Sequence, residues 1–188
     1  MRRWFRRDRG ASLVETAIVL PVILLLTLGM SEVAFLVVDY LTVTNSAREG
    51  ARTGASAADY VDGVTGIDAD DLILEAVEQA ACNLHYSTLL TVKIYQADAD
   101  GDPVDTTTVL NEYQPGVGGL DCSTSGNGLT CTNGCPWAVA TRNRALPTPD
   151  LLGVEIVFNH DAVIGFVPFP TTSWTEVAVM RLEPDTKG

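Results

Sequence analysis

Hydrophobic residues are concentrated in one long run near the start of the 188-residue chain, where residues 16–31 carry no charge. As a helix these residues would extend about 24 Å, slightly less than the roughly 30 Å hydrocarbon layer of a membrane. Extending the run to residues 11–38 adds only two charged residues, Glu15 and Glu32, each near one end. The run is apolar on all sides and no other segment is large enough to bury it, so we predict a membrane-spanning helix. Pro21 is tolerated in such a helix and marks a kink or a place to unwind.

The same helix is expected to continue, now polar, to about residue 58. Small side chains recur there at every fourth position in two neighbouring rows: Ser46, Gly50 and Gly54, and Ala47, Ala51 and Ala55. Such rows let another helix approach closely, and glycine costs about 1 kcal/mol relative to alanine inside a helix, which favours a packing role. Arg48, Glu49 and Arg52 flank the rows and could pair with partner helices. The alternative is a helix that frays into a linker here.

From residue 59 onward the pattern changes to short alternating segments. After a polar, glycine-spaced loop over residues 59–71, Asp70 and Asp71 suit the first turn of a helix, because the amino terminus of a helix favours carboxylates. The apolar residues of this helix recur with a 3.6-residue period: Ile73, Ala76, Val77, Ala80 and Leu84. Alternation of apolar and polar residues then predicts four strands, over residues 90–95, 104–110, 152–158 and 174–182.

These segments together predict an α+β protein with a long amino-terminal transmembrane helix and a small helix packed on an antiparallel sheet of about four strands. We divide the chain into a basic leader over residues 1–10, a transmembrane and extended helix over residues 11–58, and an outer domain over residues 59–188. Within that domain, residues 114–150 are rich in Gly, Ser, Asn, Pro and Cys and predict a long irregular loop. A small core with so long a loop needs a tether.

Charge is divided as sharply as hydrophobicity. Residues 1–10 hold five arginines and one aspartate, whereas residues 53–188 hold five basic and nineteen acidic residues. Because short basic flanks stay in the cytoplasm, the amino terminus is predicted inside and the outer domain outside. An acidic body lacks the clustered positive surface that nucleic-acid binding requires. Ordinary signal cleavage is the less favoured alternative, since the nearest A-x-A site, residues 55–57, lies far beyond the apolar run.

The cysteines supply the expected tether, and all four lie on the outer side of the membrane helix: Cys82, Cys122, Cys131 and Cys135. An even number of cysteines in an oxidising compartment predicts two disulfides, for which three connectivities exist. We favour a bond from Cys82 into the loop over residues 114–150, with the remaining two cysteines closing that loop on itself. A zinc site is the alternative, because Cys82-x-x-His85 and Cys131-x-x-x-Cys135 have spacings close to those of zinc ligands.

Other candidate chemistry is sparse. Residues 98–103 (DADGDP) place three carboxylates at alternate positions, as calcium sites do, but the glycine is fourth instead of sixth and no bidentate glutamate follows. We therefore favour an Asp-Gly hairpin turn there. The two histidines, His85 and His160, occur without a G-x-S-x-G, H-E-x-x-H or P-loop motif. No set of residues supplies a nucleophile, a base and an orienting group, so we predict neither an enzyme nor a cofactor.

The residues around Glu15 carry a further pattern. The sequence RGASLVE places Glu15 fifth after Gly10, behind a short basic leader. This arrangement resembles that of type IV pilins and pseudopilins. The resemblance implies that a prepilin peptidase cuts between Gly10 and Ala11 on the cytoplasmic side. It also implies that the new α-amino group, largely protonated at neutral pH, pairs with Glu15 of a neighbouring subunit, because a lone carboxylate is costly in hydrocarbon.

A second motif, NSAREGAR over residues 45–52, makes the resemblance more specific. With Pro21, Glu32 and the closing VMRLEP over residues 179–184, the chain resembles the TadE-like family, which are pseudopilins of the Flp or tight-adherence (Tad) pilus. The likeness covers about the first 55 residues well and the rest loosely. Thr16 departs from it, since Flp-type sites often have an aromatic residue after the glutamate.

The resemblance implies a structural role for the chain, as a minor pilin or pseudopilin with a pilin-like fold. Its helix would lie in the cytoplasmic membrane, or in the pilus, and its outer domain would be periplasmic or extracellular. The implied partners are other pilins and pseudopilins, the Tad secretion machinery and the prepilin peptidase. The alternative function is a permanently anchored surface module that binds a ligand through residues 114–150.

Overall fold

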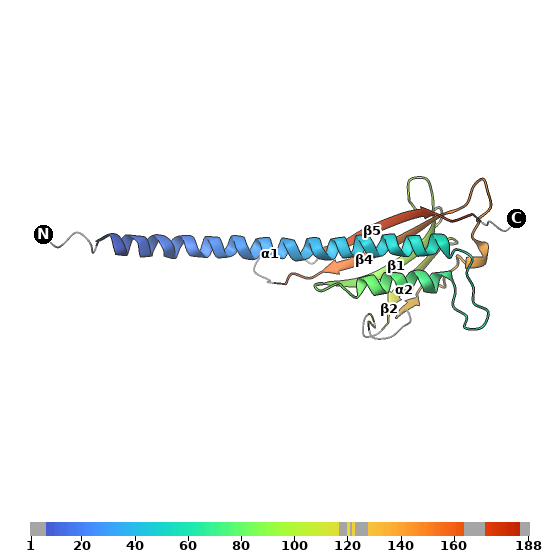
Figure 1. Ribbon diagram of the computed structural model, residues 1–188, viewed down its shortest axis with the longest axis horizontal. Coiled ribbons are helices and arrows are strands. Elements are labelled where there is room, and N and C mark those ends of the chain that lie inside the picture. The colour runs from blue at the N-terminus through green and yellow to red at the C-terminus, as the bar shows by residue number, and fades with distance from the viewer. Residues whose placement is uncertain (1–6, 117–119, 121, 123–127, 164–171, 185–188) are drawn as a thin grey trace.

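The structure is a computed structural model that describes residues 7–116, 120, 122, 128–163 and 172–184. The described residues form two α-helices, five strands and one 3-10 helix: α1 (Arg7–Ser56), α2 (Ala69–Ala81), β1 (Ser87–Ala97), β2 (Leu110–Pro115), β3 (Leu129–Cys131), η1 (Val139–Thr141), β4 (Leu151–His160) and β5 (Thr172–Arg181). The amino-terminal half of α1 projects from the molecule as a stalk (Figure 1). Its carboxy-terminal half lies beside α2, along the sheet.

The strands form a single antiparallel sheet in the order β3-β2-β1-β4-β5. Its centre is the long pairing of β1 with β4, which runs from Ser87 opposite His160 to Ala97 opposite Leu151. The predicted α+β class is confirmed, with five described strands in place of about four. The fifth is β3, whose three residues are too short and too polar in their surroundings to show an alternating pattern.

One predicted strand is wrong. The sequence placed a strand over residues 104–110, but β2 begins only at Leu110. The Asp105 carboxylate accepts hydrogen bonds from the backbone N–H of Thr107 and from the hydroxyls of Thr107 and Thr108. These local bonds hold the chain in a turn, which is the usual effect of an Asp followed by Thr residues.

One face of the sheet forms the core with the two helices. Alternate residues of the central strands point to this face and are buried: Val92 and Ile94 in β1, and Leu152, Val154, Ile156 and Phe158 in β4. The residues between them point to the opposite face, where Lys93 and Glu155 lie directly opposite each other and form an ion pair of 2.6 Å. The alternation that predicted these strands therefore also selected the face that the helices cover.

Glycines bring α1 close to its neighbours in the same chain. A Cβ added to Gly50 would lie 2.6 Å from Val77 of α2, and one added to Gly54 would lie 2.6 Å from Ile73 and would also overlap Leu152 of β4. None of these three side chains is long and flexible, so only glycine fits without a shift of the packing. The row of small residues in α1 therefore allows close packing of α2.

The start of α2 is fixed by the preceding residue. Asp68 is the N-cap and accepts hydrogen bonds from the backbone N–H groups of Asp70 and Asp71, while the Asp71 side chain accepts from the Asp68 N–H. This reciprocal capping box satisfies donors that a helix start leaves free. Asp70 lies in the first turn as predicted but is buried, so it contributes to the core and not only to the helix end.

Candidate functional site

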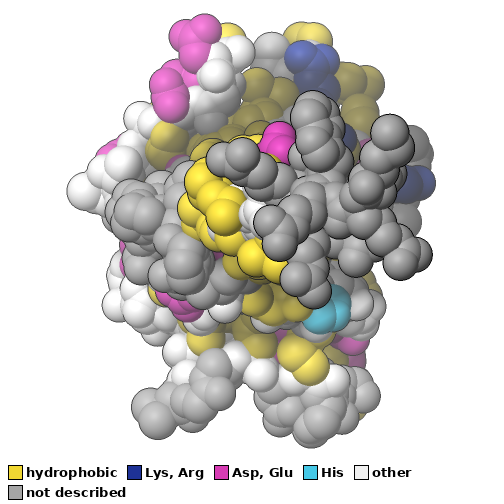
Figure 2. All heavy atoms as spheres, turned by 90° about the vertical axis from the view of Figure 1, so that its left-hand side faces the viewer, with side chains coloured by type: hydrophobic (Ala, Val, Ile, Leu, Met, Phe, Trp, Pro, Cys, Tyr) yellow, Lys and Arg dark blue, Asp and Glu magenta, His cyan; other side chains and the backbone are white. Residues whose placement is uncertain are grey.

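The stalk has the length and composition of a membrane span. Within the described residues one helical stretch, Gly10–Ser56, is long and apolar enough to cross a membrane, and none of its most apolar 18-residue window is buried. Viewed from the amino-terminal end, hydrophobic side chains gather near the centre of the molecule, where α1 points at the viewer (Figure 2). The first buried residue of the stalk is Glu32, so residues 10–31 form about 33 Å of uncovered helix. This matches the hydrocarbon thickness of a bilayer.

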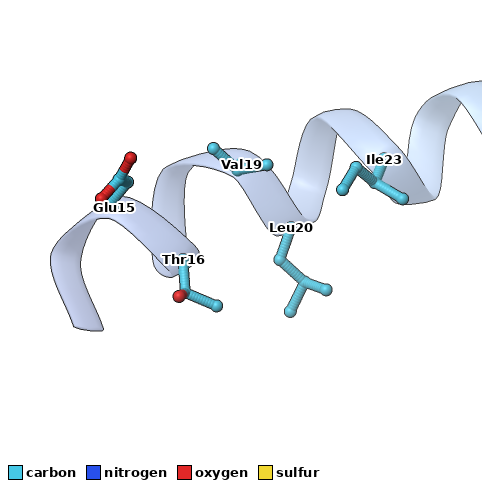
Figure 3. Close-up of a pocket in the computed structure, with 5 residues that line it drawn as sticks. All are labelled: Glu15, Thr16, Val19, Leu20 and Ile23. Atoms are coloured by element: carbon cyan, nitrogen blue, oxygen red, sulfur yellow. The ribbon is translucent and has the colours of Figure 1, made fainter. Parts of the chain in front are cut away.

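Glu15 lies on this uncovered helix. Its carboxylate, with Val19 and Ile23 one and two turns farther on, points to one side of α1, and Thr16 and Leu20 point to another (Figure 3). These five residues line a shallow hollow along the helix surface. No described residue forms a hydrogen bond or an ion pair with the Glu15 carboxylate. In lipid, such a carboxylate requires a partner from outside the described residues.

The predicted cleavage site lies at the start of the same helix. Gly10 and Ala11 are helical and exposed, and a Cβ added to Gly10 would have open space around it. Residues 1–6 of the predicted leader lie outside the described residues. The peptide bond between Gly10 and Ala11 is thus uncovered by the rest of the described chain, and cleavage there stays a prediction.

The predicted packing segment divides between two faces of α1. Its small residues are buried against α2 and the sheet: Ser46, Ala47, Gly50, Ala51 and Gly54. Its charged residues Arg48, Glu49 and Arg52 are exposed on the outward side. The small residues therefore serve packing within the chain, whereas the charged ones face away from it.

Two carboxylates of α1 attach the helix to the outer domain. Glu32 and Asp39 lie two turns apart on one side of α1, and both are almost fully buried. Glu32 accepts a hydrogen bond of 2.7 Å from the backbone N–H of Val163, just after β4. Asp39 accepts bonds from the Tyr86 N–H (3.2 Å) and the Ser87 hydroxyl (2.7 Å) at the start of β1. The outer domain therefore first contacts α1 at Glu32. The sequence placed the end of the apolar run farther on, at residue 38.

His160 completes this contact without forming a catalytic arrangement. Its Nδ1 lies 3.1 Å from the Ser87 hydroxyl oxygen and 3.5 Å from Asp39. The Ser87 hydroxyl donates to the Asp39 carboxylate, so Ser87, Asp39 and His160 form one hydrogen-bonded cluster. The group is also buried, with His160 6% exposed. Its geometry supports attachment of β4 and β1 to α1.

A buried polar network holds the loop before β4. The Asp70 carboxylate accepts hydrogen bonds from the Asn111 amide (2.8 Å) and the Tyr113 hydroxyl (2.9 Å), and forms an ion pair with Arg142. The Arg142 guanidinium lies 4.5 Å from the ring centroid of Trp137, whose backbone also bonds to Asn111. Burial, and then the nearby Asp70 charge, raises the pKa of Tyr113 well above its ordinary value. The network fixes part of the predicted loop over residues 114–150 inside the protein.

The cysteine sulfurs lie in two pairs at bonding distance. Cys82 is bonded to Cys122 and Cys131 to Cys135, a pattern that fits the expectation of two disulfides. The first pair joins the end of α2 to the loop, and the second closes a short part of the loop on itself. The three cysteine sulfurs of the two motifs proposed for zinc are therefore all engaged in disulfides. Residues 117–119, 121 and 123–127 of the loop lie outside the described residues.

The other proposed ion site is an internally satisfied turn. The Asp98 carboxylate accepts hydrogen bonds from the backbone N–H groups of Asp100 (2.9 Å) and Asp102 (3.0 Å), and Gly101 has a positive φ of 97°. The Tyr95 hydroxyl donates to the Gly101 carbonyl at 3.0 Å. Among the described residues no group of three His, Cys, Asp or Glu side chains could hold a metal ion.

Residues 10–52 match the family model described as TadE-like protein. This segment of 43 of the 188 residues is similar to the TadE-like family. The match includes Glu15, both attachment carboxylates Glu32 and Asp39, and the charged residues of the SAREGAR motif. Searches of curated proteins and of solved structures found no match to the chain. The predicted family is thus confirmed on the stalk and on the α1 segment that meets the outer domain.

Several residues of this TadE-like chain that matter structurally were missed from sequence. Asp39 carried a usable signal, since it stands seven residues after Glu32 and so lies on the same side of an otherwise apolar helix. The pairing of Asp70 with Arg142 carried none, because the two residues are 72 positions apart and no local pattern links them.

Proposed function

We propose that this TadE-like chain is a pseudopilin or minor pilin that takes part in assembly of a Tad/Flp pilus. The observation that carries the proposal is the extent of the family match, which begins at Gly10 beside the predicted cleavage site and ends at Arg52 within α1. The matched segment holds the stalk, Glu15 and the contacts that attach the outer domain. In this function the stalk anchors the chain in the membrane and later joins other pilins.

Processing of the leader would prepare the stalk for assembly. A prepilin peptidase would cut between Gly10 and Ala11 and free an α-amino group that is largely protonated at neutral pH. Glu15 is exposed and lacks a partner among the described residues, so within lipid it needs a cation from another chain. The α-amino group freed at the amino terminus of a neighbouring pilin supplies that cation, and the pair sets the axial register of the two subunits.

The proposed orientation places the amino terminus in the cytoplasm and the outer domain on the other side. The basic leader favours this orientation. Two cysteine pairs at bonding distance support an oxidising compartment for the outer domain. The chain is then a single-pass protein of the cytoplasmic membrane, whose partners are other pilins and pseudopilins, the Tad secretion machinery and the prepilin peptidase.

Mass spectrometry and pilus counting test this proposal in cells that make the protein naturally. We expect a mature amino terminus at Ala11. We also expect Glu15→Gln, which keeps the side-chain shape but removes its charge, to abolish pilus formation by electron microscopy. Asp100→Asn is the matched control, because it removes a charge from an exposed loop of the outer domain and should leave pili unchanged.

Two results would contradict parts of the proposal. An intact Met1 terminus in cells with active prepilin peptidase would refute the cleavage step. Normal pili in Glu15→Gln cells would refute the assembly role of the carboxylate and leave the chain as a single-pass anchor for its outer domain.

A further inference from the structure

The outward side of α1 carries a regular seam of exposed residues above the stalk. Its members alternate in spacing between four and three residues and are all exposed: Ala34, Val38, Leu41, Asn45, Arg48 and Arg52. At 100° per residue they lie opposite the packed row that includes Val43, Ala47 and Gly50. The 4-3 spacing is that of the contact positions of a helix in a coiled coil.

The first half of the seam is apolar although it lies beyond the uncovered stalk. Val38 and Leu41 are 56% and 53% exposed, and both follow Glu32, where the outer domain begins to cover the other side of α1. Asn45 follows them at a position where a single polar residue commonly sets the register of a helix pair. The seam therefore has the elements of a helix-binding surface outside the hydrocarbon layer.

The second half of the seam carries cations that the chain does not pair. Among the described Lys and Arg residues from 48 to 184, three form ion pairs: Lys93 with Glu155, Arg142 with Asp70, and Arg144 with Asp59. Arg48 and Arg52, one turn apart on the seam, form none, although residues 53–188 hold nineteen acidic residues. Arg181, at the end of β5, is the third unpaired cation in this described set.

These charges decide against a second copy of the chain. Two copies anchored in one membrane by their amino-terminal helices run parallel. In register they would place Arg48 opposite Arg48, and shifted by the four residues between Ala11 and Glu15 they would place Arg52 opposite Arg48. Like charges in such positions destabilise a helix pair. A partner helix with carboxylates at the matching level would instead pair with both arginines.

We infer that the seam binds a parallel, membrane-anchored helix of a different chain, which places carboxylates beside Arg48 and Arg52. This inference rests on the membrane anchoring in the proposed function and identifies the partner by its charge. The partner continues along the stalk below, where the same side of α1 is also uncovered.

Photo-crosslinking of the full chain tests the inference in cells that make it naturally. The probe is benzoylphenylalanine at Asn45, with a control probe at Val177, an exposed residue of the sheet. We expect an ultraviolet-dependent adduct at Asn45 only. Peptide mass spectrometry should identify its partner as a different chain that has an amino-terminal apolar helix and carboxylates near the crosslinked residue.

Charge variants show whether the arginines select the partner. Replacing both by glutamate (Arg48→Glu with Arg52→Glu) should lower the adduct yield at least about fivefold, since two attractive exposed pairs become repulsive. Arg48→Lys with Arg52→Lys should retain the adduct. Arg181→Glu reverses an unpaired cation away from the seam and should leave the yield unchanged.

Three outcomes would overturn the inference: an adduct with a second copy of this chain, no adduct at Asn45, or an undiminished adduct after charge reversal. Circular dichroism of the purified variants must show an unchanged fold. Mass spectrometry of the same samples also identifies the amino terminus. Loss of cleavage before Ala11 bears on the proposed function, and loss of the adduct bears on this inference.

Discussion

At the scale of single residues, three buried carboxylates determine how the parts of this protein are joined. Glu32 and Asp39 receive hydrogen bonds from the segments after β4 and before β1, and Asp70 receives them from β2 and from the loop before β4. A buried carboxylate is costly unless hydrogen bonds or a cation compensate it. Each therefore favours only the arrangement in which its distant partners are present.

We expect Arg142→Met to destabilise the protein strongly. The substitution leaves Asp70 buried without its cation, and the loss of one member of a buried pair costs about 3–5 kcal/mol. Lys93→Met is the matched control, because its partner Glu155 lies on the partly exposed face of the sheet and such pairs contribute about 1 kcal/mol or less. Urea unfolding of the full chain in detergent measures both, and equal losses would contradict the structural role of Asp70.

At the scale of elements, α1 is one helix in two environments. Its first part exposes apolar side chains on all sides, as a lipid-facing helix does, and its second part buries one side in a protein core. The change occurs at Glu32, where the outer domain first contacts the helix. The same helix thus links the uncovered stalk directly to the sheet.

Glycine positions along α1 should respond differently to alanine in the two environments. Gly54→Ala places a methyl group against Ile73 and Leu152, and overpacking of this kind costs about 1–3 kcal/mol. Gly29→Ala should be neutral or stabilising, because a Cβ there meets nothing within 4 Å and alanine is the better helix former. Thermal unfolding by circular dichroism compares them. A destabilised Gly29→Ala with an unaffected Gly54→Ala would contradict the packing.

At the scale of the whole molecule, a small sheet and two helices share one core. Two disulfides fix parts of the loop over residues 114–150. The core includes residues of α1, such as Val43 and Ala51, together with residues of α2 and of all five described strands. The predicted division of the chain at residue 58 stays a prediction, since residues on both sides of it contribute to this core. The Cys82–Cys122 bond ties the loop beyond β2 to α2.

The two disulfides should differ in their contribution to stability. Cys82–Cys122 spans 40 residues and Cys131–Cys135 spans 4. By loop-closure entropy, replacing the first pair by serine should cost about 4 kcal/mol and the second about 2 kcal/mol. Denaturant unfolding of the two double-serine variants tests the order of the losses. A larger loss from the Cys131–Cys135 pair would show that the loop over residues 114–150 is held mainly by its own local closure.

Sequence patterns predicted those parts of the fold in which neighbouring residues share one environment. The uncharged run, the 3.6-residue period of α2 and the alternation in β1, β4 and β5 each report a face that is uniformly buried or uniformly exposed. Residues 104–110 failed this test because the side chain of Asp105 competed with strand pairing, and β3 failed because three residues hold too little pattern.

The sequence by itself indicated the long apolar helix, the α+β class and the TadE-like segment, because composition, periodicity and a local motif are properties of adjacent residues. It also placed Glu15 and the charged residues of α1 on a helix. Only the tertiary structure decided that Gly50 and Gly54 face α2 and the sheet, that Arg48 and Arg52 face outward, and that Asp70 meets Arg142. These outcomes depend on contacts between residues far apart in the chain, and no local pattern encodes which distant side chain will occupy a given space.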